Sequence, residues 1–548
     1  MMKTTMNDYF SVYEAPGDTE QVIERCLRQL LSERFDERIW SHDTSLWQGD
    51  SAEIAQRLGW LHLDDTMPEH LQRVKEAAHE LIQAGYTDAV LLGMGGSSLG
   101  AEVLARVLGQ SDGLRIHILD SIVPSAITRV RSSIDLEHSV FIVSSKSGST
   151  LEPNLLYEYF RTLLESKVGS SEAGAHFIAI TDPDTSLDRL GRAAGFRHVF
   201  LNPADIGGRY SVGSLFGLVP GALSGVDIAR LLREWSQMAQ SCRPSAEAGV
   251  NAGAALGAFM AGCTLSGRDK LTIITSPEIR SFGWWAEQLI AESTGKRGKG
   301  IIPIVDEPFL SPASYSDDRA FLYIRLTNGD NMAADEQIRA LTTAGQPCAT
   351  IDLAYRYQLG GEFFRWEYAT ACAGALLRID PFNQPNVQSA KDASNSVLSR
   401  YMAEGKLPTL SHIESADSLL NEPMEGSYVA VMAYLCRRDE VDEVMAGFRR
   451  RVGERYHIAT TFGYGPRFLH STGQLHKGGP PTGRFLQIVS GHHPDIPLPK
   501  RPYTFGVAAD AQAQGDLEAL RSLGRHVARI RLERDDVDQL ASTLARFA

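Results

Sequence analysis

Short apolar runs alternate with helix-length segments along most of this chain, and this alternation constrains the fold more than any other feature. Five such runs lie in the first half: DAVLLGMG, LRIHILD, SVFIVSS, HFIAITD and HVFLNP. The stretches between them are long enough for crossover helices, so the pattern predicts parallel strands in a doubly wound sheet. The fold class is therefore α/β, and the first unit is expected to span residues 60–225.

A second α/β unit is expected over residues 226–415, from the runs KLTIIT, AFLYIRL and CATIDL. A C-terminal α/β segment over 416–548 is expected from YVAVMAYL, HIATTFG, RFLQIV, TFGVA and VARIRL. Residues 1–59 are predicted to be helical, because VIERCLRQLLSERF spaces its apolar residues by three and four. At 548 residues, the chain is long enough to hold several such units.

The composition excludes several functional classes. A net charge of -13 argues against nonspecific binding to nucleic acid or acidic membranes, because phosphates attract positive charge. No apolar run approaches membrane-spanning length, and the N-terminus MMKTTMNDYFSVYEAPGD lacks the apolar core of a secretory signal. The six cysteines are scattered and form no CxxC pair. We therefore expect a cytoplasmic protein without a zinc site, and neither nucleic acid nor membrane as a partner.

Two turns rich in glycine and hydroxyl groups follow predicted strands. LLGMGGSSLG contains Ser97, and VFIVSSKSGSTLEPN contains Ser145, Lys146, Ser147 and Thr150. Glycines let a backbone approach a ligand closely, and hydroxyls donate hydrogen bonds without carrying charge. A tight turn or a serine-rich helix cap would explain either motif alone. Two such turns at the carboxyl edge of one sheet favour a phosphate-binding site instead.

The two turns resemble those of the sugar-isomerase (SIS) fold and, within it, of the glucose-6-phosphate isomerase family. Three further segments resemble elements of that family in the same order: GGRYSVGS at 207–214, EQLIAESTGKRGKG at 287–300 and DPFNQPNVQSAK at 380–391. The last one has Asn383, Asn386 and Gln388 where the family has Asp, Gly and Glu. The chain most resembles the isomerase half of a bifunctional transaldolase–isomerase; because no transaldolase barrel precedes it, that second activity is expected to be absent.

The resemblance implies roles for individual residues. Glu292 matches the family's catalytic base, which moves a proton between C1 and C2 of the open-chain sugar. Arg209 matches the arginine that stabilises the enediolate, and Lys391 matches the lysine near the ring oxygen and the C1 hydroxyl. The hydroxyl-rich turns, with Lys146, would hold the sugar phosphate. Glu287, which precedes the base on the same predicted helix, is expected to be structural.

The family opens the sugar ring with a histidine, but no histidine lies between Glu292 and Lys391. The segment FLHSTGQLHKGG has the Leu-His-Ser-x-Gly-Gln context that often surrounds that histidine. His470 is therefore expected to take this role, with His476 as a weaker alternative. A loop histidine satisfied by its neighbours is the simplest competing interpretation. The expected role requires the C-terminal segment to fold back onto the sheet edges near Glu292.

The resemblance thus implies an enzyme, an aldose–ketose isomerase that interconverts D-glucose 6-phosphate and D-fructose 6-phosphate through a cis-enediolate. It would act in glycolysis and gluconeogenesis, without metal or organic cofactor, and as a homodimer. Two alternatives stay open: an isomerase of another anionic hexose, such as a mannose phosphate or a sulfonated sugar, and a non-catalytic sugar-phosphate-binding protein. The combination of Glu292, Arg209 and Lys391, without a basic DNA-binding region, favours an enzyme.

Overall fold

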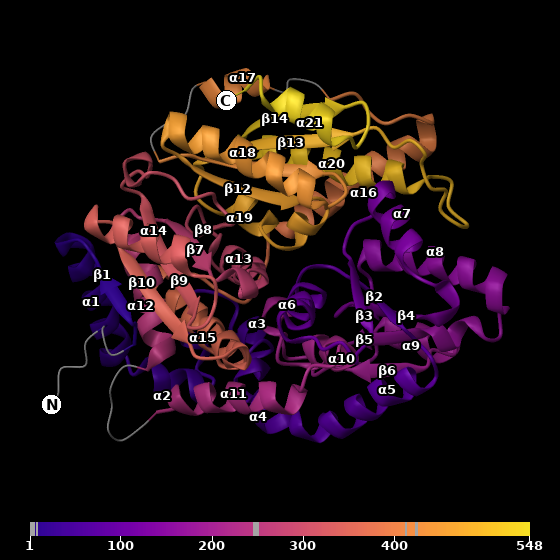
Figure 1. Cartoon of the computed structure of the whole chain (residues 1–548), viewed down its shortest axis with the longest axis horizontal. Helices are drawn as coiled ribbons and strands as arrows, with labels where there is room; N and C mark the ends of the chain where they lie inside the picture. The colour runs from indigo at the N-terminus through magenta and orange to yellow at the C-terminus, as the bar shows by residue number, and fades with distance from the viewer. Residues whose placement is uncertain (1–5, 7–8, 245–250, 411–413, 422–425, 548) are drawn as a thin grey trace.

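Figure 1 shows the computed structural model, which describes residue 6 and residues 9–244, 251–410, 414–421 and 426–547. Three β-sheets, each flanked by helices, form three lobes around a common centre (Figure 1). The predicted fold class, α/β with parallel sheets, is confirmed. None of the helices in the described part of the chain is long and apolar enough to cross a membrane.

The first sheet is entirely parallel, with strand order β3-β2-β4-β5-β6. Its strands are β2 (Asp88–Gly93), β3 (Arg115–Leu119), β4 (Ser139–Ser144), β5 (Phe177–Thr181) and β6 (His198–Leu201), which coincide with the five predicted runs. Its helices are α5 (Leu71–Gln83), α6 (Leu99–Leu108), α7 (Pro124–Ser133), α8 (Leu151–Val168), α9 (Ser186–Ala193) and α10 (Leu215–Leu223). Because β2 and β4 are neighbours, the turns that follow them open at the same edge.

The second sheet has the order β1-β10-β9-β7-β8. Its strands are β1 (Val12–Glu14), β7 (Lys270–Thr275), β8 (Ile302–Val305), β9 (Arg319–Leu326) and β10 (Cys348–Leu353). The helices of this lobe are α1 (Gly17–Ser32), α2 (Phe35–Trp40), α3 (Ser51–Ala55), α4 (Leu63–Thr66), α11 (Ile228–Ser241), α12 (Ala252–Leu265), α13 (Ser281–Thr294), α14 (Met332–Thr343) and α15 (Leu359–Leu377). The N-terminal segment is therefore not only helical, because β1 pairs antiparallel with β10.

The third sheet is parallel, with the order β12-β11-β13-β14. Its strands are β11 (Tyr428–Tyr434), β12 (Ala459–Tyr464), β13 (Gly483–Ser490) and β14 (His526–Leu532). Its helices are α17 (Ala416–Asn421), α18 (Asp439–Tyr456), α19 (Gly473–Gly478), α20 (Phe505–Ser522) and α21 (Val537–Leu544). The strand expected at TFGVA is wrong: Thr504 accepts a hydrogen bond from the Val507 amide and caps the start of α20.

Helix α13, which carries Glu292, lies where the three lobes meet (Figure 1). It contacts α6 of the first lobe, α15 and β8 of the second, and α19 of the third. The long helix α16 (Val387–Glu404) follows the second lobe in sequence, yet it packs most extensively against α20 of the third. The C-terminal third of the chain is therefore built into the centre of the molecule.

Candidate active site

The turn after β2 is held between two distant segments. Gly95 has a positive φ of 54°, and a Cβ there would overlap the carbonyl oxygen of His470. A Cβ on Gly96 would overlap the carbonyl oxygen of Gly208 in the same way. The FLHSTGQ segment therefore does reach this edge of the first sheet, as the ring-opening role of His470 requires. Ser97 ends the turn and is half-buried.

The turn after β4 keeps its hydroxyl groups close together. The Ser145 and Thr150 hydroxyl oxygens lie 2.9 Å apart, and those of Ser147 and Ser149 lie 3.0 Å apart. Thr150 is the N-cap residue of α8, but its side chain makes no capping hydrogen bond. The hydroxyls are therefore not used as a helix cap, and those of Ser147 and Ser149 lie on exposed residues that an anion can reach.

Lys146 differs from the other residues of this turn. Its ammonium is paired with the Asp182 carboxylate, which follows β5, and donates to the Ala204 carbonyl at 2.7 Å. We predicted that Lys146 contacts the phosphate directly. In the structure its charge is compensated by Asp182 instead. The structure favours a lysine that fixes the turn against the loop after β5, with the hydroxyls and backbone amides left to bind an anion.

Glu292 and Arg209 form the buried ion pair of the site. Arg209 Nη1 lies 3.3 Å from Glu292 Oε1, and the two residues are 3% and 7% exposed. Glu292 lies in the last turn of α13, next to Ser293, whose hydroxyl accepts a 2.7 Å hydrogen bond from Arg209 Nε. A carboxylate and a fixed guanidinium are thus side by side, as a proton transfer next to a developing oxyanion requires.

The segment after α15 fixes the guanidinium of Arg209. Nη2 donates to the carbonyls of Pro381 and Asn383 at 2.6 and 3.0 Å, and Nη1 donates to the side-chain oxygen of Gln384 at 3.2 Å. Asn383, where the sequence departs from the family pattern, takes part through its backbone. A change of its side chain therefore leaves this contact intact, which explains how the departure is tolerated.

The imidazole of His470 is paired with a carboxylate from the first lobe. His470 Nε2 lies 2.9 Å from Glu152 Oε1, and Gln512 of α20 donates to the same oxygen at 2.7 Å. Burial would raise the pKa of Glu152, but the attraction and hydrogen bond of His470, with the bond from Gln512, outweigh it and lower this pKa to about 2. Glu152 is therefore ionised at neutral pH.

An ionised Glu152 decides the tautomer of His470. A carboxylate can only accept hydrogen bonds, so Nε2 of His470 carries a proton and Nδ1 is the nitrogen left for chemistry. Sequence reasoning did not assign Glu152 or Gln512 to the site. Glu152 could have been found, because it follows the hydroxyl turn by only two residues; Gln512 has no sequence signal.

Gln512 is expected to hold this pair in place. Replacing it with leucine removes a hydrogen bond to the Glu152 carboxylate, and we expect kcat to fall about tenfold. The acidic limb of the pH–rate profile should move to higher pH, because this hydrogen bond lowers the pKa of Glu152. The matched control is Gln514→Leu on the same helix, whose side chain bonds to Glu518 at 2.9 Å instead. Equal effects of both substitutions on the pH profile would show that Gln512 only supports the helix.

A second glutamine connects the base to the histidine segment. Gln288 lies one helical turn before Glu292 and donates to its Oε2 at 3.0 Å and to the carbonyl oxygen of His470 at 2.8 Å. One side chain thus bridges α13 and the 3-10 turn η12 (Arg467–His470). The i, i+4 spacing of Gln288 and Glu292 was the available signal in the sequence.

Lys391 is not brought into contact with this group. It lies in the second turn of α16, is exposed, and has no recorded side-chain bond to the rest of the described chain. The start of α16 is nevertheless tied to the site, because Gln474 exchanges two hydrogen bonds with Asn386, at 2.9 and 2.8 Å. The predicted role of Lys391 therefore stays a prediction.

His476, the weaker ring-opening candidate, is a core residue. Its ring is buried between Phe468 and Phe485, and burial, followed by the charges of Lys477 and Arg525, lowers its pKa well below the ordinary value. Lys477 is equally unavailable, because its ammonium lies 2.5 Å from the buried carboxylate of Asp516. Of the two histidines in this segment, His470 is therefore the one that stays a candidate for ring opening.

Glu287 also behaves as a structural residue, with a distinct pH signature. Burial raises the pKa of its carboxyl to about 8, against 4.5 for the free side chain. Between these values the folded state binds more protons than the unfolded state, so stability falls as pH rises from about 5 to 8.

We expect Glu287→Gln to reduce this decline. The melting temperature of the wild type should drop a few °C more than that of the variant between about pH 5 and pH 9. Glu440→Gln, at an exposed position of α18, is the control and should follow the wild type. Identical pH dependence in wild type and Glu287→Gln would contradict the raised pKa.

Known proteins resemble this chain in both sequence and fold. Residues 61–299 match the model of the phosphoglucose isomerase family. A glucose-6-phosphate isomerase of Leptospira biflexa is 30% identical over 65% of this chain and 90% of the relative. One of Rubrobacter xylanophilus is 29% identical over 62% of this chain and 89% of the relative.

Solved structures share the fold at lower identity. A hypothetical protein of Thermus thermophilus aligns over 72% of this chain and 100% of its own, with a TM-score of 0.57 and 23% identity. A glucose-6-phosphate isomerase of Chlamydia trachomatis aligns over 65% of this chain and 76% of its own, with a TM-score of 0.53 and 22% identity. The doubly wound sheets and hydroxyl-rich turns place the chain in the sugar-isomerase (SIS) class. Within that class it belongs to the phosphoglucose isomerase family.

Proposed function

We propose that this protein interconverts D-glucose 6-phosphate and D-fructose 6-phosphate through a cis-enediolate, as an enzyme of glycolysis and gluconeogenesis. The observation that carries the proposal is the Glu292–Arg209 pair, 3.3 Å apart and buried beside the hydroxyl-rich turns, in a chain of this family. The cytoplasm, expected from the sequence, and a homodimer, expected from the resemblance, are part of the same proposal.

The hydroxyl turns bind the phosphate end of the sugar. Ser97, Ser145, Ser147 and Thr150 supply neutral donors at one sheet edge, and Lys146 holds the second turn in place. Neutral donors suit a substrate that must be released, because they bind a dianion without forming a tight ion pair.

The His470–Glu152 pair opens the ring. In the imidazolium form, Nδ1 of His470 donates a proton to the ring oxygen as the bond from that oxygen to the anomeric carbon breaks. The proton of the anomeric hydroxyl passes to a water molecule as the carbonyl forms, and Lys391 assists at this hydroxyl. Glu152 stabilises the imidazolium during this step and keeps the ring oriented.

Glu292 then moves the proton that defines the isomerisation. Its carboxylate removes the proton from C2 of the open-chain aldose and returns it to C1, while a second proton moves between the two oxygens. Negative charge develops on those oxygens in the enediolate, and the guanidinium of Arg209 stabilises it. Because four acceptors hold Arg209 in advance, little reorganisation is needed during the reaction.

The direct test is turnover by the purified protein in both directions. Formation of glucose 6-phosphate from fructose 6-phosphate is measured by coupling to glucose-6-phosphate dehydrogenase, and the reverse reaction by discontinuous assay. Mannose 6-phosphate and a 6-sulfonated glucose are run beside them, because the hydroxyl turns suit any tetrahedral anion. Negligible turnover of fructose 6-phosphate, with turnover of one of the others, would replace the substrate; no turnover of any would support a binding protein.

A further inference from the structure

A second polar cavity lies where the three lobes meet. It has a volume of about 990 Å³ and is lined by β3, α6 and α7 of the first lobe. Residues between 277 and 284 of the second lobe and between 435 and 467 of the third complete it. Its described lining includes neither Glu292 nor His470, so it is separate from the candidate active site. A volume of this size suits a small organic ligand.

Arginines dominate the wall of this cavity, although the whole chain carries a net charge of -13. They are Arg106, Arg115, Arg129, Arg280, Arg437, Arg438 and Arg467. Three of them share one carboxylate: Arg106, Arg437 and Arg467 lie 2.8, 2.9 and 2.6 Å from the buried side chain of Glu102. Burial would raise the pKa of Glu102, but the three guanidiniums outweigh it and hold this pKa well below the ordinary value.

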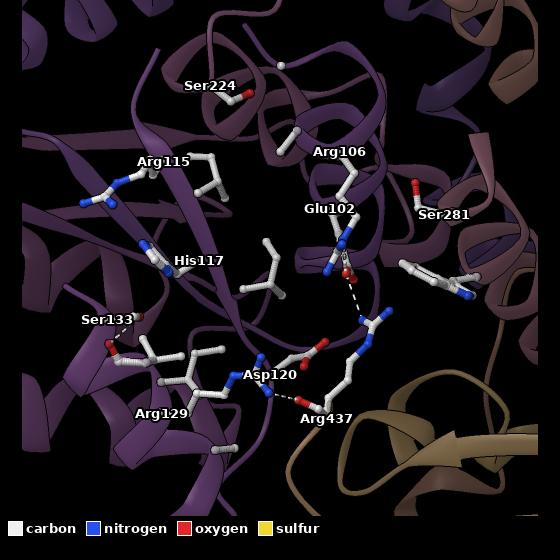
Figure 2. Close-up of a pocket in the computed structure, with 18 of the residues that line it drawn as sticks. Glu102, Arg106, Arg115, His117, Asp120, Arg129, Ser133, Ser224, Ser281 and Arg437 are labelled. Carbon is white, nitrogen blue, oxygen red and sulfur yellow. Dashed lines mark hydrogen bonds and ion pairs between the residues drawn. The ribbon is translucent and has the colours of Figure 1, made fainter. Parts of the chain in front are cut away.

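Two carboxylates face four guanidiniums in this part of the wall. Asp120 pairs with Arg467 at 2.8 Å, and Arg129 donates to the backbone carbonyl of Arg437 at 2.8 Å, without a carboxylate partner in the described chain. Figure 2 shows Arg437 reaching Glu102 and Arg129 reaching the backbone of Arg437, with Asp120 between them. We call this group the Glu102 cluster; its members are Glu102, Asp120, Arg106, Arg129, Arg437 and Arg467. It has more guanidiniums than carboxylates.

The other charged groups of the wall are engaged elsewhere. Arg115, Arg280 and Arg438 pair with Asp88, Asp306 and Asp535. Among the acids, Glu278 accepts from the Asp330 amide and Asp442 from the Tyr464 hydroxyl, and Asp439 lies exposed at the start of α18. The excess of guanidiniums is thus confined to the Glu102 cluster, while Glu278, Asp439 and Asp442 bring carboxylates without an ion-pair partner in the described chain to another part of the wall.

Arg106 and Arg129 have donors to spare. Both are exposed; Arg106 uses Nε for its bond to Glu102, and Arg129 bonds through Nη1 to the Arg437 carbonyl and also to the Cys436 thiol. A guanidinium carries five N–H donors in a planar fork that matches the oxygens of a phosphate. The remaining N–H groups are therefore available to an anion that enters the cavity.

We propose that this cavity binds a small phosphate-bearing metabolite, with Arg106, Arg129 and Arg437 as its phosphate ligands. The site is connected to the catalytic histidine, because Arg467 begins the same short 3-10 turn, η12, that ends at His470. An anion that draws Arg106 and Arg437 away from Glu102 leaves this carboxylate to Arg467 alone, and so changes how the turn is attached to α6. Binding therefore alters the ring-opening step, a consequence that rests on the proposed isomerase function.

Pyrophosphate is the probe for binding, measured by titration calorimetry. The background variant is Ser147→Asp, whose added charge keeps anions out of the hydroxyl turn of the active site. We expect this variant to bind about one pyrophosphate per chain, and Ser147→Asp/Arg106→Ala/Arg129→Ala to bind on the order of tenfold or more weakly. Arg28→Ala in the same background is the matched control, because Arg28 is an equally exposed arginine on α1.

Loss of pyrophosphate binding in the Ser147→Asp background, or binding that survives both arginine substitutions, would overturn the site. This measurement does not depend on isomerase activity, so it remains decisive if the proposed function fails. In active protein, kcat at saturating fructose 6-phosphate should change at least about twofold on adding pyrophosphate, with the change lost in Arg106→Ala/Arg129→Ala. Binding with an unchanged kcat would keep the site and overturn its connection to His470.

Discussion

Glu292→Gln is expected to lower kcat about 10²- to 10⁴-fold with little change in KM. The amide keeps the size of the carboxylate, but it cannot take the proton from C2. Gln288 and Arg209, the two recorded partners of Glu292, can still contact the substituted side chain, so the site should stay assembled. Exchange of the C2 hydrogen with solvent deuterium, followed by NMR, should be lost together with turnover.

Glu287→Gln is the matched control for this substitution, because Glu287 lies on the same helix and is not part of the candidate site. It should keep near-wild-type kcat. If Glu292→Gln retained full isomerisation in protein free of host enzyme, another group would have to be the base. The Glu292–Arg209 pair would then be structural.

His470→Gln is expected to separate ring opening from proton transfer. With fructose 6-phosphate, which is mostly cyclic, kcat should fall about 10²-fold because the proton donor to the ring oxygen is lost. A substrate that cannot close, 5-deoxyfructose 6-phosphate, has no ring to open. Its C1 hydrogen should still exchange with solvent at close to the wild-type rate, because Glu292 is untouched.

Two further variants make this test specific. Glu152→Gln should show the same selectivity as His470→Gln, and the double variant should be little worse than either, because the two groups act as a unit. His526→Gln, at an exposed histidine of β14, is the control and should leave both rates unchanged. Equal losses on the cyclic and the open substrate would contradict a ring-opening role for His470.

The sheets were predictable because strands buried on both faces of a parallel sheet have continuous apolar sequences. Each of β2, β4 and β11 is fully buried and coincides with such a run. The failures are short or ambiguous elements. Strand β1 (VYE) has three residues, of which two are exposed, so no apolar run marks it. The run at Phe505 is apolar because the start of α20 is buried, and a short apolar run does not distinguish a strand from a buried helix.

The site was predictable where it uses local motifs, and unpredictable where it uses long-range pairs. The hydroxyl turns and the Glu292 segment are contiguous in sequence, whereas the Glu152–Gln512 bond joins residues separated by 360 positions. Lys146 is an intermediate case: its place in the turn was visible, but its pairing with Asp182 depends on how the loop after β5 packs. The sequence shows which side chains a turn contains, but the packing of distant segments determines which of them form ion pairs or hydrogen bonds.

The position of His470 has a consequence for the order in which the enzyme matures. Chains are synthesised from the N-terminus, so the phosphate turns and Glu292 leave the ribosome well before His470 and Gln512. Gln512 lies on α20, and β14, an edge strand of the third sheet, follows it. A growing chain can therefore expose its hydroxyl turns before it contains the histidine to which we assign ring opening. In the proposed mechanism, turnover of the cyclic substrate therefore requires the third lobe to have been synthesised and folded.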